Sequence, residues 1–145
     1  MGELVVEKIE NGTVIDHIPA GMGMKVLSIL GAGQGMKTAL LMNVASKRVG
    51  KKDILKFSDK QLTEKEVSKI ALIAPAATLN IIKNGSVVEK GNIQLPKEIA
   101  GVAKCPNPRC ITNSSEKAET RFRSEAAGLR CSYCEMLFES KELIV

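Results

Sequence analysis

The chain has 145 residues, of which 44% are hydrophobic and 26% charged, and its formal net charge is +5. This composition excludes a disordered chain or a fibrous repeat, and the length suits one medium domain or two small ones. The apolar runs are too short to span a bilayer and the N-terminus lacks a signal-peptide pattern, so we expect a cytoplasmic protein. Four thiolates on one divalent ion would lower the charge to about +3, a mild excess that suits an anionic ligand.

Strand and helix patterns alternate through the first part of the chain. Strand-like segments at 4–9 and 13–18 are separated by Asn11-Gly12, a turn-forming pair. Pro19 ends the second segment and can open a helix. That helix would carry four apolar residues on one side, namely Met22, Val26, Ile29 and Leu30. Two further strand candidates, 38–46 and 51–57, follow with a basic turn between them.

A second helix has the clearest start signal in the chain. Thr63 to Glu66 has the sequence of a capping box, in which the last glutamate reaches back to the cap. Apolar residues follow with helical spacing at Val67, Ile70, Ala71 and Ala74, and Pro75 stops the helix. Two more strand candidates then flank Asn84-Gly85, a pair that supplies the positive φ angles of a tight hairpin.

The element order β-α-β-β-α-β predicts an α+β fold, a ferredoxin-like sandwich with both helices on one face of an antiparallel sheet. After it, the segment 91–104 changes to a connection interrupted by Pro and Gly, and every cysteine lies beyond it. We therefore predict a boundary near Pro96, with one domain at 1–97 and a second, small all-β domain of the zinc-ribbon type at 98–145.

The second domain contains two chelating cysteine pairs. Cys105 and Cys110 are separated by four residues, twenty residues follow, and Cys131 and Cys134 are separated by two. Four thiolates close a tetrahedral site and leave no position for water, which predicts one structural zinc ion and no catalytic metal. Two disulfides or buried free thiols are the alternatives. A module of this size has little core, so metal binding should supply much of its folding free energy.

Two features of the first domain resemble functional motifs but have ordinary explanations. The glycine-rich segment 31–38 lacks the contiguous Gly-Lys-Thr of a P-loop and the third glycine of a dinucleotide fingerprint, so it is interpreted as a helix-to-strand loop. His17 is the only histidine and lies beside Asp16. Neighbours on a regular strand point to opposite faces, so these two can serve one ligand only where the strand bends or ends.

Basic residues offer two further interpretations. Lys52 and Lys56 would share one face of a strand, about 13 Å apart, which suits the ends of a nucleoside triphosphate; a solvated charged face is the alternative. The alternative function is a zinc-ribbon nucleic-acid-binding protein, whose phosphate contacts would come from four arginines of the second domain, Arg109, Arg121, Arg123 and Arg130. The chain has only one tyrosine and three phenylalanines on which bases could stack, and this scarcity disfavours nucleic-acid binding. A single histidine and a closed metal site also disfavour a stand-alone enzyme.

Five segments together resemble the regulatory chain of aspartate carbamoyltransferase: GTVIDHIPAG at 12–21, GKKDILK at 50–56, APAATLN at 74–80, CPNPRCIT at 105–112 and CSYCE at 131–135. The resemblance implies a polypeptide without catalytic residues that dimerises through its first domain and docks its zinc domain onto the catalytic chain. It implies regulatory dimers that join catalytic trimers, six chains of each kind, and CTP and ATP as effectors of pyrimidine biosynthesis.

The resemblance also implies nucleotide-binding residues in the first domain. Asp16 would contact the ribose and His17 the phosphates, Lys52 and Lys56 would lie near ribose, base or phosphate, and Lys90 would bind phosphate. Asn80 would line the base pocket, together with the backbone near Glu7, Lys8, Ile9, Ile82 and Val87.

Overall fold

The computed structural model describes residues 9–30, 35–47, 50–114 and 118–143, which form two compact units. The first unit comprises Met1–Leu62 and Ala76–Ile93, and the second comprises Thr63–Pro75 and Gln94–Val145. The predicted linear division at residues 97 and 98 stays a prediction, since these units are defined by packing and not by one cut in the chain. None of the described helices has the length and apolarity that a membrane span requires.

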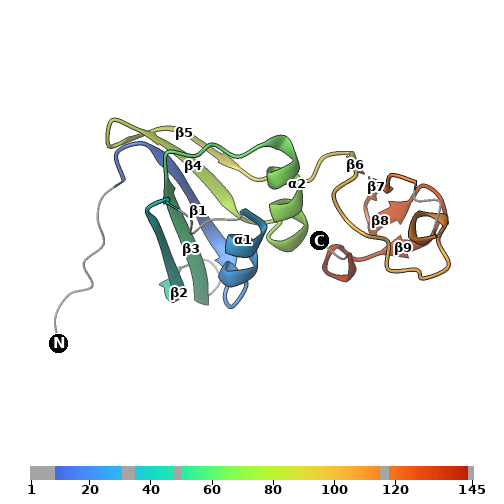
Figure 1. The fold of residues 1–145 in the computed structure, drawn as a ribbon. Coiled ribbons are helices and arrows are strands. Elements are labelled where there is room, and N and C mark those ends of the chain that lie inside the picture. Colours follow the sequence, from blue (N-terminus) through green and yellow to red (C-terminus); the bar gives the residue numbers. More distant parts are fainter. Residues whose placement is uncertain (1–8, 31–34, 48–49, 115–117, 144–145) are drawn as a thin grey trace. The chain divides into compact units, whose positions relative to one another are not determined.

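The first unit is an antiparallel five-stranded sheet with one helix (Figure 1). Its elements are β1 (Gly12–Pro19), α1 (Gly23–Leu30), β2 (Thr38–Ser46), β3 (Gly50–Ser58), β4 (Thr78–Lys83) and β5 (Ser86–Asn92). The strand order is β2-β3-β1-β4-β5, so β1 lies between β3 and β4. The α+β prediction is confirmed, and β4 and β5 are the two strands predicted on either side of Asn84-Gly85. The packing of the second helix on this sheet stays a prediction, as does the predicted strand at 4–9, most of which lies outside the described residues.

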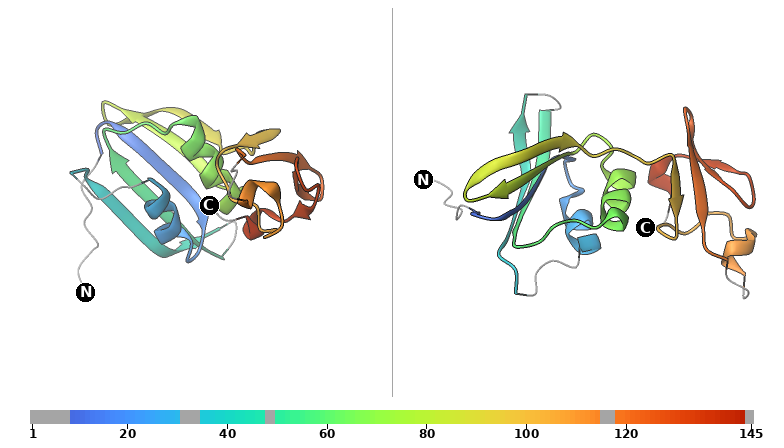
Figure 2. Two further views of the ribbon diagram at one scale, coloured as in Figure 1. Left: turned by 45° about the vertical axis from the view of Figure 1, so that its right-hand side comes forward. Right: turned by 90° about the horizontal axis from the view of Figure 1, so that it is seen from above.

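The strands bury one face of the sheet against α1 (Figure 2). Ile15, Leu55 and Phe57 are fully buried, and Val26 and Leu30 are the buried apolar residues of the helix. Pro19 ends β1 as predicted, but the helix begins only at Gly23. A Cβ at Gly23 would lie 2.7 Å from Leu40 Cδ1 and 2.9 Å from Asp53 Oδ2, so only glycine fits where the helix starts against β2 and β3.

A bulge in β1 breaks the alternation of its side chains. The register with β3 shifts between Ile15 and Ile18, and His17 has a left-handed backbone with φ of 59°. The extra residue allows Ile15 and Ile18 to point into the core although they are three positions apart. The predicted bend that Asp16 and His17 need in order to share one side of the sheet is therefore present.

The predicted hairpin between β4 and β5 has the expected turn. Lys83 pairs with Ser86, and the two residues between them have positive φ, 53° at Asn84 and 78° at Gly85. This is the conformation for which Asn-Gly is the preferred dipeptide. The hairpin tip is held by the segment before β1, because the amide of Gly85 donates to the carbonyl oxygen of Glu10 over 2.8 Å.

Asp53 is a buried carboxylate that joins three parts of the first unit. Its side chain is fully buried, and Oδ2 accepts hydrogen bonds of 2.9 Å from the backbone amides of Gly21 and Gly23. The other oxygen, Oδ1, accepts a 2.9 Å bond from the amide of Asn43, which has a positive φ in the irregular part of β2. One side chain therefore fixes the turn before α1, the start of that helix and the bend of β2.

The second unit combines a helix with a four-stranded antiparallel sheet of order β6-β7-β8-β9. Its elements are α2 (Glu64–Ile73), β6 (Glu98–Ala100), η1 (Ile111–Asn113), β7 (Arg121–Glu125), β8 (Gly128–Cys131), β9 (Leu137–Phe138) and η2 (Ser140–Glu142). The capping box is confirmed, with Thr63 Oγ1 accepting from the amide of Glu66 and the Glu66 carboxylate accepting from the amide of Thr63. β6 lies in the segment that the sequence indicated as a connection only.

The core of the second unit contains the cysteines themselves. Three of them, Cys105, Cys110 and Cys131, are buried in one cluster with seven other residues, Leu72, Ile99, Ala103, Phe122, Leu129, Phe138 and Leu143. Leu72 of α2 belongs to this cluster and was not part of the predicted apolar side of the helix, of which Ile70, Ala71 and Ala74 are fully buried. Any metal held by the cysteines is therefore bound inside the hydrophobic core.

We predict that Asp53→Asn destabilises the first unit. An amide group keeps the size of the side chain but has one acceptor oxygen for three backbone donors, and each buried donor left unpaired costs about 1–3 kcal/mol. Glu89→Gln removes the same charge from an exposed position on β5 and is the control. Urea unfolding followed by circular dichroism measures both variants; equal midpoints for the two would contradict this role of Asp53.

Candidate metal centre and anion-binding face

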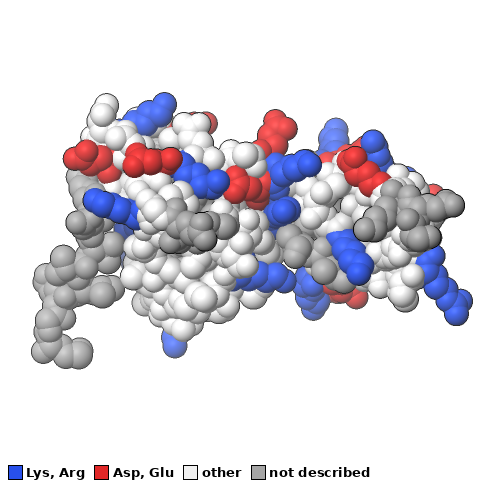
Figure 3. Space-filling view, viewed as in Figure 1, with Lys and Arg blue, Asp and Glu red and all other residues white. Residues whose placement is uncertain are grey.

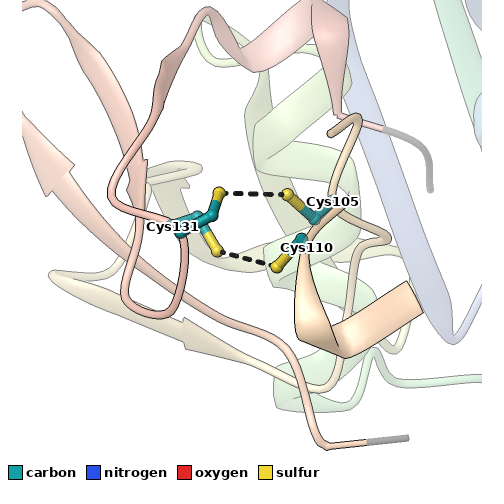
Figure 4. Close-up of side chains that lie close together, drawn as sticks. Cys105, Cys110 and Cys131 are labelled. Atoms are coloured by element: carbon teal, nitrogen blue, oxygen red, sulfur yellow. Dashed lines mark hydrogen bonds between the residues drawn. The ribbon is translucent and has the colours of Figure 1, made fainter. Parts of the chain in front are cut away.

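The four cysteine sulfurs lie together in the second unit. Their Sγ atoms are all within 4.8 Å of one another, with 3.8 Å between Cys105 and Cys134 and 3.7 Å between Cys110 and Cys131. Figure 4 shows the sulfurs of Cys105, Cys110 and Cys131 approaching from two facing loops. All four cysteines are free, and these separations are far longer than the S–S bond of about 2.05 Å in a disulfide. The structure therefore contains no disulfide among them.

This arrangement fits one zinc ion. Tetrahedral coordination with Zn–S bonds of about 2.3 Å places the ligand sulfurs about 3.8 Å apart, which matches the separations of 3.8 Å and 3.7 Å in this cluster. Four thiolates this close would repel one another without a cation between them. Since all four positions of the tetrahedron come from the protein, the ion has a structural role and offers no site for a reacting molecule.

Short turns place each pair of ligands. In the first pair, the side-chain oxygen of Asn107 accepts from the amide of Arg109, and its carbonyl oxygen accepts from the amide of Cys110 over 3.0 Å. Asn113 Nδ2 then donates to the carbonyl oxygens of Cys105 and Asn107. In the second pair, the amide of Glu135 donates to the carbonyl of Cys131, and Glu135 has a positive φ of 63°. Both turns are thus closed by hydrogen bonds that place their two sulfurs on the same side of the chain's loops as one another.

The thiols differ in their acidity. Burial raises the pKa of Cys105 and of Cys131 above the ordinary thiol value. Burial acts in the same direction on Cys134, but hydrogen bonds from the amide of Met136 and from the Asn107 side chain outweigh it and lower its pKa to about 7. The charge of a bound divalent ion would favour ionisation of all four thiols.

The polar residues proposed for the first domain share one face of the sheet, the face opposite α1. Lys56, Val14, Asn80 and Lys90 are successive partners across β3, β1, β4 and β5. Directly paired residues in antiparallel strands point to the same side, so these four form one row about 14 Å long, three strand spacings. Within the described residues, neither Lys56 nor Lys90 has an ion-pair partner.

Asp16, His17 and Lys52 form a second group on this face. Lys52 Nζ lies 2.9 Å from Asp16 Oδ1 and 3.2 Å from Oδ2. The His17 ring places Nδ1 3.0 Å from Thr78 Oγ1, and Thr78 is the direct cross-strand partner of Asp16. Burial alone would raise the pKa of Asp16, but the hydrogen bond from Lys52, followed by that from the His17 amide, lowers it below its ordinary value.

Thr78 had no signal in the sequence as part of this group, because its contact with His17 depends on the register of β4 against β1. Of the residues predicted for the base pocket, Ile82 is the partner of Gly12 and of Val87. Ile9 borders the same place, since a Cβ at Gly12 would lie 3.0 Å from Ile9 Cγ2. Glu7 and Lys8 lie outside the described residues.

The arginines of the second unit do not form a free basic stripe. Arg121 and Arg130 each make an ion pair of 2.8 Å, the first with Glu98 and the second with Glu125. Figure 3 shows basic and acidic side chains interspersed over the viewed surface of the described residues. A nucleic-acid interface would instead gather cations along one path for the phosphates.

Two family models match nearly the whole chain. Residues 4–94 match the allosteric domain of the aspartate carbamoyltransferase regulatory chain, and residues 97–144 match its metal binding domain. The chain belongs to the aspartate carbamoyltransferase regulatory chain family. It is 52% identical to the regulatory chain of Saccharolobus solfataricus over 98% of its own length and 92% of the relative's. It is 46% identical to that of Sulfolobus acidocaldarius over 98% and 90% of the two chains.

Membership in the aspartate carbamoyltransferase regulatory chain family settles the class of function. The chain is a regulatory, non-catalytic polypeptide with an allosteric domain and a metal-binding domain, as the sequence predicted. His17 is therefore not the centre of a catalytic set. The four-cysteine cluster lies in the part that matches the metal-binding domain, and the row from Lys56 to Lys90 lies in the part that matches the allosteric domain.

Removing one sulfur should release the metal and unfold the second unit. We predict that Cys131→Ser binds less than one zinc ion per chain and loses amide protection over residues 98–143, because structural zinc contributes about 10–16 kcal/mol in small modules. Ser132→Ala changes the neighbouring residue without touching the sulfurs and is the control. Metal analysis and hydrogen exchange read out both variants; full zinc content with unchanged protection in Cys131→Ser would contradict the four-sulfur site.

The Asp16–Lys52 pair gives a separate prediction on pH. A lowered pKa means that the pair stabilises the folded state above the unfolded pKa of about 3.9, and that this stabilisation is lost as pH falls through the folded value. In Lys52→Met the burial of Asp16 remains without its main hydrogen-bond donor, so the pKa of Asp16 should rise. NMR titration of the Asp16 carboxyl measures it, with Lys51→Met, an exposed neighbour, as control. If the pKa of Asp16 is unchanged in Lys52→Met, Lys52 does not lower it and the ion pair has no such role.

Proposed function

We propose that the chain binds nucleoside triphosphates of the CTP and ATP type on the face opposite α1 and transmits their effect to the catalytic chain of aspartate carbamoyltransferase. The observation that supports this is the position of Asp16, Lys52, Lys56, Asn80 and Lys90, all on one face of one sheet. A nucleotide can use all three kinds of group, because its phosphates bind cations, its ribose hydroxyls bind a carboxylate and its base binds an amide.

Each of these groups has a chemical task toward a nucleotide. Lys56 and Lys90 are cations without an acidic partner among the described residues, so they can neutralise phosphate oxygens. Asp16 is held ionised by Lys52 and can accept hydrogen bonds from ribose hydroxyls. The row from Lys56 to Lys90 is about 14 Å long, which is enough room for a nucleoside triphosphate on this face of the sheet.

The base would lie near the start of β1 and the β4–β5 hairpin. Asn80 carries both a donor and an acceptor, and the backbone near Ile9, Ile82 and Val87 supplies amide and carbonyl groups, which can distinguish an amino from a keto substituent. Glu7 and Lys8 belong to the same proposed pocket. His17, whose ring already bonds Thr78, would add a donor to the phosphates when protonated.

The regulatory effect requires two quaternary states. An effector that binds away from the chemistry shifts an equilibrium only by binding one state more tightly than the other. We infer that nucleotide binding changes the first domain and its contact with a second regulatory chain, and that the metal-binding domain carries the bias to the catalytic chain.

Association with that catalytic chain follows from membership in the family. The finer assembly is part of the proposal: regulatory dimers formed through the first domain, which link catalytic trimers into six catalytic and six regulatory chains. Such a complex would act in the cytoplasm and control the flow into pyrimidine biosynthesis.

We predict that Lys90→Ala weakens the effector response and leaves assembly intact. Losing one charge-assisted hydrogen bond to phosphate should reduce nucleotide affinity about 10-fold or more. Lys83→Ala is the matched control, because Lys83 is an exposed lysine of the same hairpin that alternates to the other side of β4. The measurement is nucleotide titration of the reconstituted complex by calorimetry and by its effect on carbamoyltransferase activity.

Two outcomes would contradict the proposal. If nucleotide affinity is unchanged in Lys90→Ala but lowered in Lys83→Ala, the nucleotide binds on the other face of the sheet and not on the face opposite α1. Failure of folded Lys90→Ala to assemble with the catalytic chain would mean that this residue serves the interface and not the effector.

A further inference from the structure

Thr112 is a buried polar residue whose hydroxyl points at a metal ligand. Its side chain is 8% exposed, and Oγ1 donates to Cys110 Sγ over a distance of 3.1 Å. No local sequence pattern indicates this contact. We propose that Thr112 is a positioning residue of the metal centre, whose hydroxyl hydrogen bond completes the set of donors around the four sulfurs and fixes the Cys110 thiolate toward the ion.

Cys105 and Cys131 receive their donors from the backbone, and Cys134 receives one from the backbone and one from the Asn107 side chain. The amide of Asn107 donates to Cys105, the amides of Tyr133 and Cys134 to Cys131, and the amide of Met136 to Cys134. For Cys110 the donor that the structure provides is the Thr112 hydroxyl. The donor to Cys110 is a side-chain hydroxyl, so a mutation can remove this hydrogen bond without disturbing the chain's own amides.

The local fold holds this hydroxyl in place. Thr112 lies in the short 3-10 turn η1, which begins directly after Cys110, and the amide of Asn113 donates to the carbonyl of Cys110 over 2.9 Å. The side chain of Asn113 bonds the carbonyls of Cys105 and Asn107, so the turn is fastened to the first cysteine loop. A buried threonine hydroxyl needs a partner, and here the partner is a sulfur two residues back.

A hydrogen bond to a ligating thiolate has a definite physical effect. It stabilises the negative charge on sulfur, orients its lone pairs and holds the ligand in the conformation that the metal requires. Its loss leaves a buried thiolate with more charge to donate to the metal and with less restraint on its rotamer. Outer groups of this kind typically change metal affinity by about 10–100-fold.

The test compares three variants of the full chain: Thr112→Val, which has the same shape without the hydroxyl, Thr112→Ser, which keeps it, and Thr120→Val. Thr120 Oγ1 donates over 2.6 Å to the carbonyl of Ala103 in the same unit, so its removal costs a hydrogen bond that does not touch sulfur. Zinc affinity is measured by competition with a chelator, and the cobalt-loaded chain reports the sulfur-to-metal charge-transfer band.

We expect Thr112→Val to bind zinc about 10–100-fold more weakly and to shift the cobalt band to lower energy, because an unbonded thiolate donates more readily. Thr112→Ser should match the unsubstituted chain in both readouts, and Thr120→Val should lose thermal stability without a shift of the band. The inference is overturned if Thr112→Val keeps both the affinity and the band, or if Thr112→Ser loses affinity as Thr112→Val does. It is also overturned if Thr120→Val reproduces the band shift, since the effect would then be a general loosening of the unit.

Discussion

Coordination of one metal ion by four sulfurs is the interaction on which the second unit depends. Strands β6 to β9 have two to five residues each, and the sheet they form could not support a stable core by itself. Three of the cysteines are buried in the same cluster as Phe122, Leu129 and Phe138, so the metal-binding ligands are also core residues. The shape of the second unit is therefore supplied by coordination chemistry in place of apolar area.

Both faces of strand β3 organise the first unit. Neighbouring residues of β3 point in opposite directions: Asp53 is fully buried and binds the start of α1 and the bend of β2, while Lys52 pairs with Asp16 on the face opposite α1. The bulge at His17 adjusts β1 in the same region, so that Ile18 remains in the core while Asp16 and His17 both reach that face. The architecture of the core and the arrangement of the proposed anion-binding groups therefore share the same few residues.

Local signals were read correctly from the sequence, and contacts that depend on register were not. A few neighbouring residues determine the conformation of the capping box at Thr63, of the Asn84-Gly85 turn and of each cysteine pair. Asp53 could not be recognised, because an acidic residue after two lysines has the pattern of a solvated strand until the fold brings three amides to it. Leu72 and Thr78 have the same difficulty, since their partners are more than twenty residues away in sequence. The bulge did leave one trace: Ile15 and Ile18 are spaced by three, which a regular strand cannot bury on one face.

The central claim is that the metal makes the second unit competent to bind the catalytic chain. Native mass spectrometry of this chain mixed with the catalytic chain, before and after removal of zinc with a chelator, tests it most directly. The account predicts one zinc ion per regulatory chain in the complex, no complex after chelation, and recovery when zinc is returned. A metal-free chain that still assembles with the catalytic chain, or a zinc-loaded chain that does not, would contradict it.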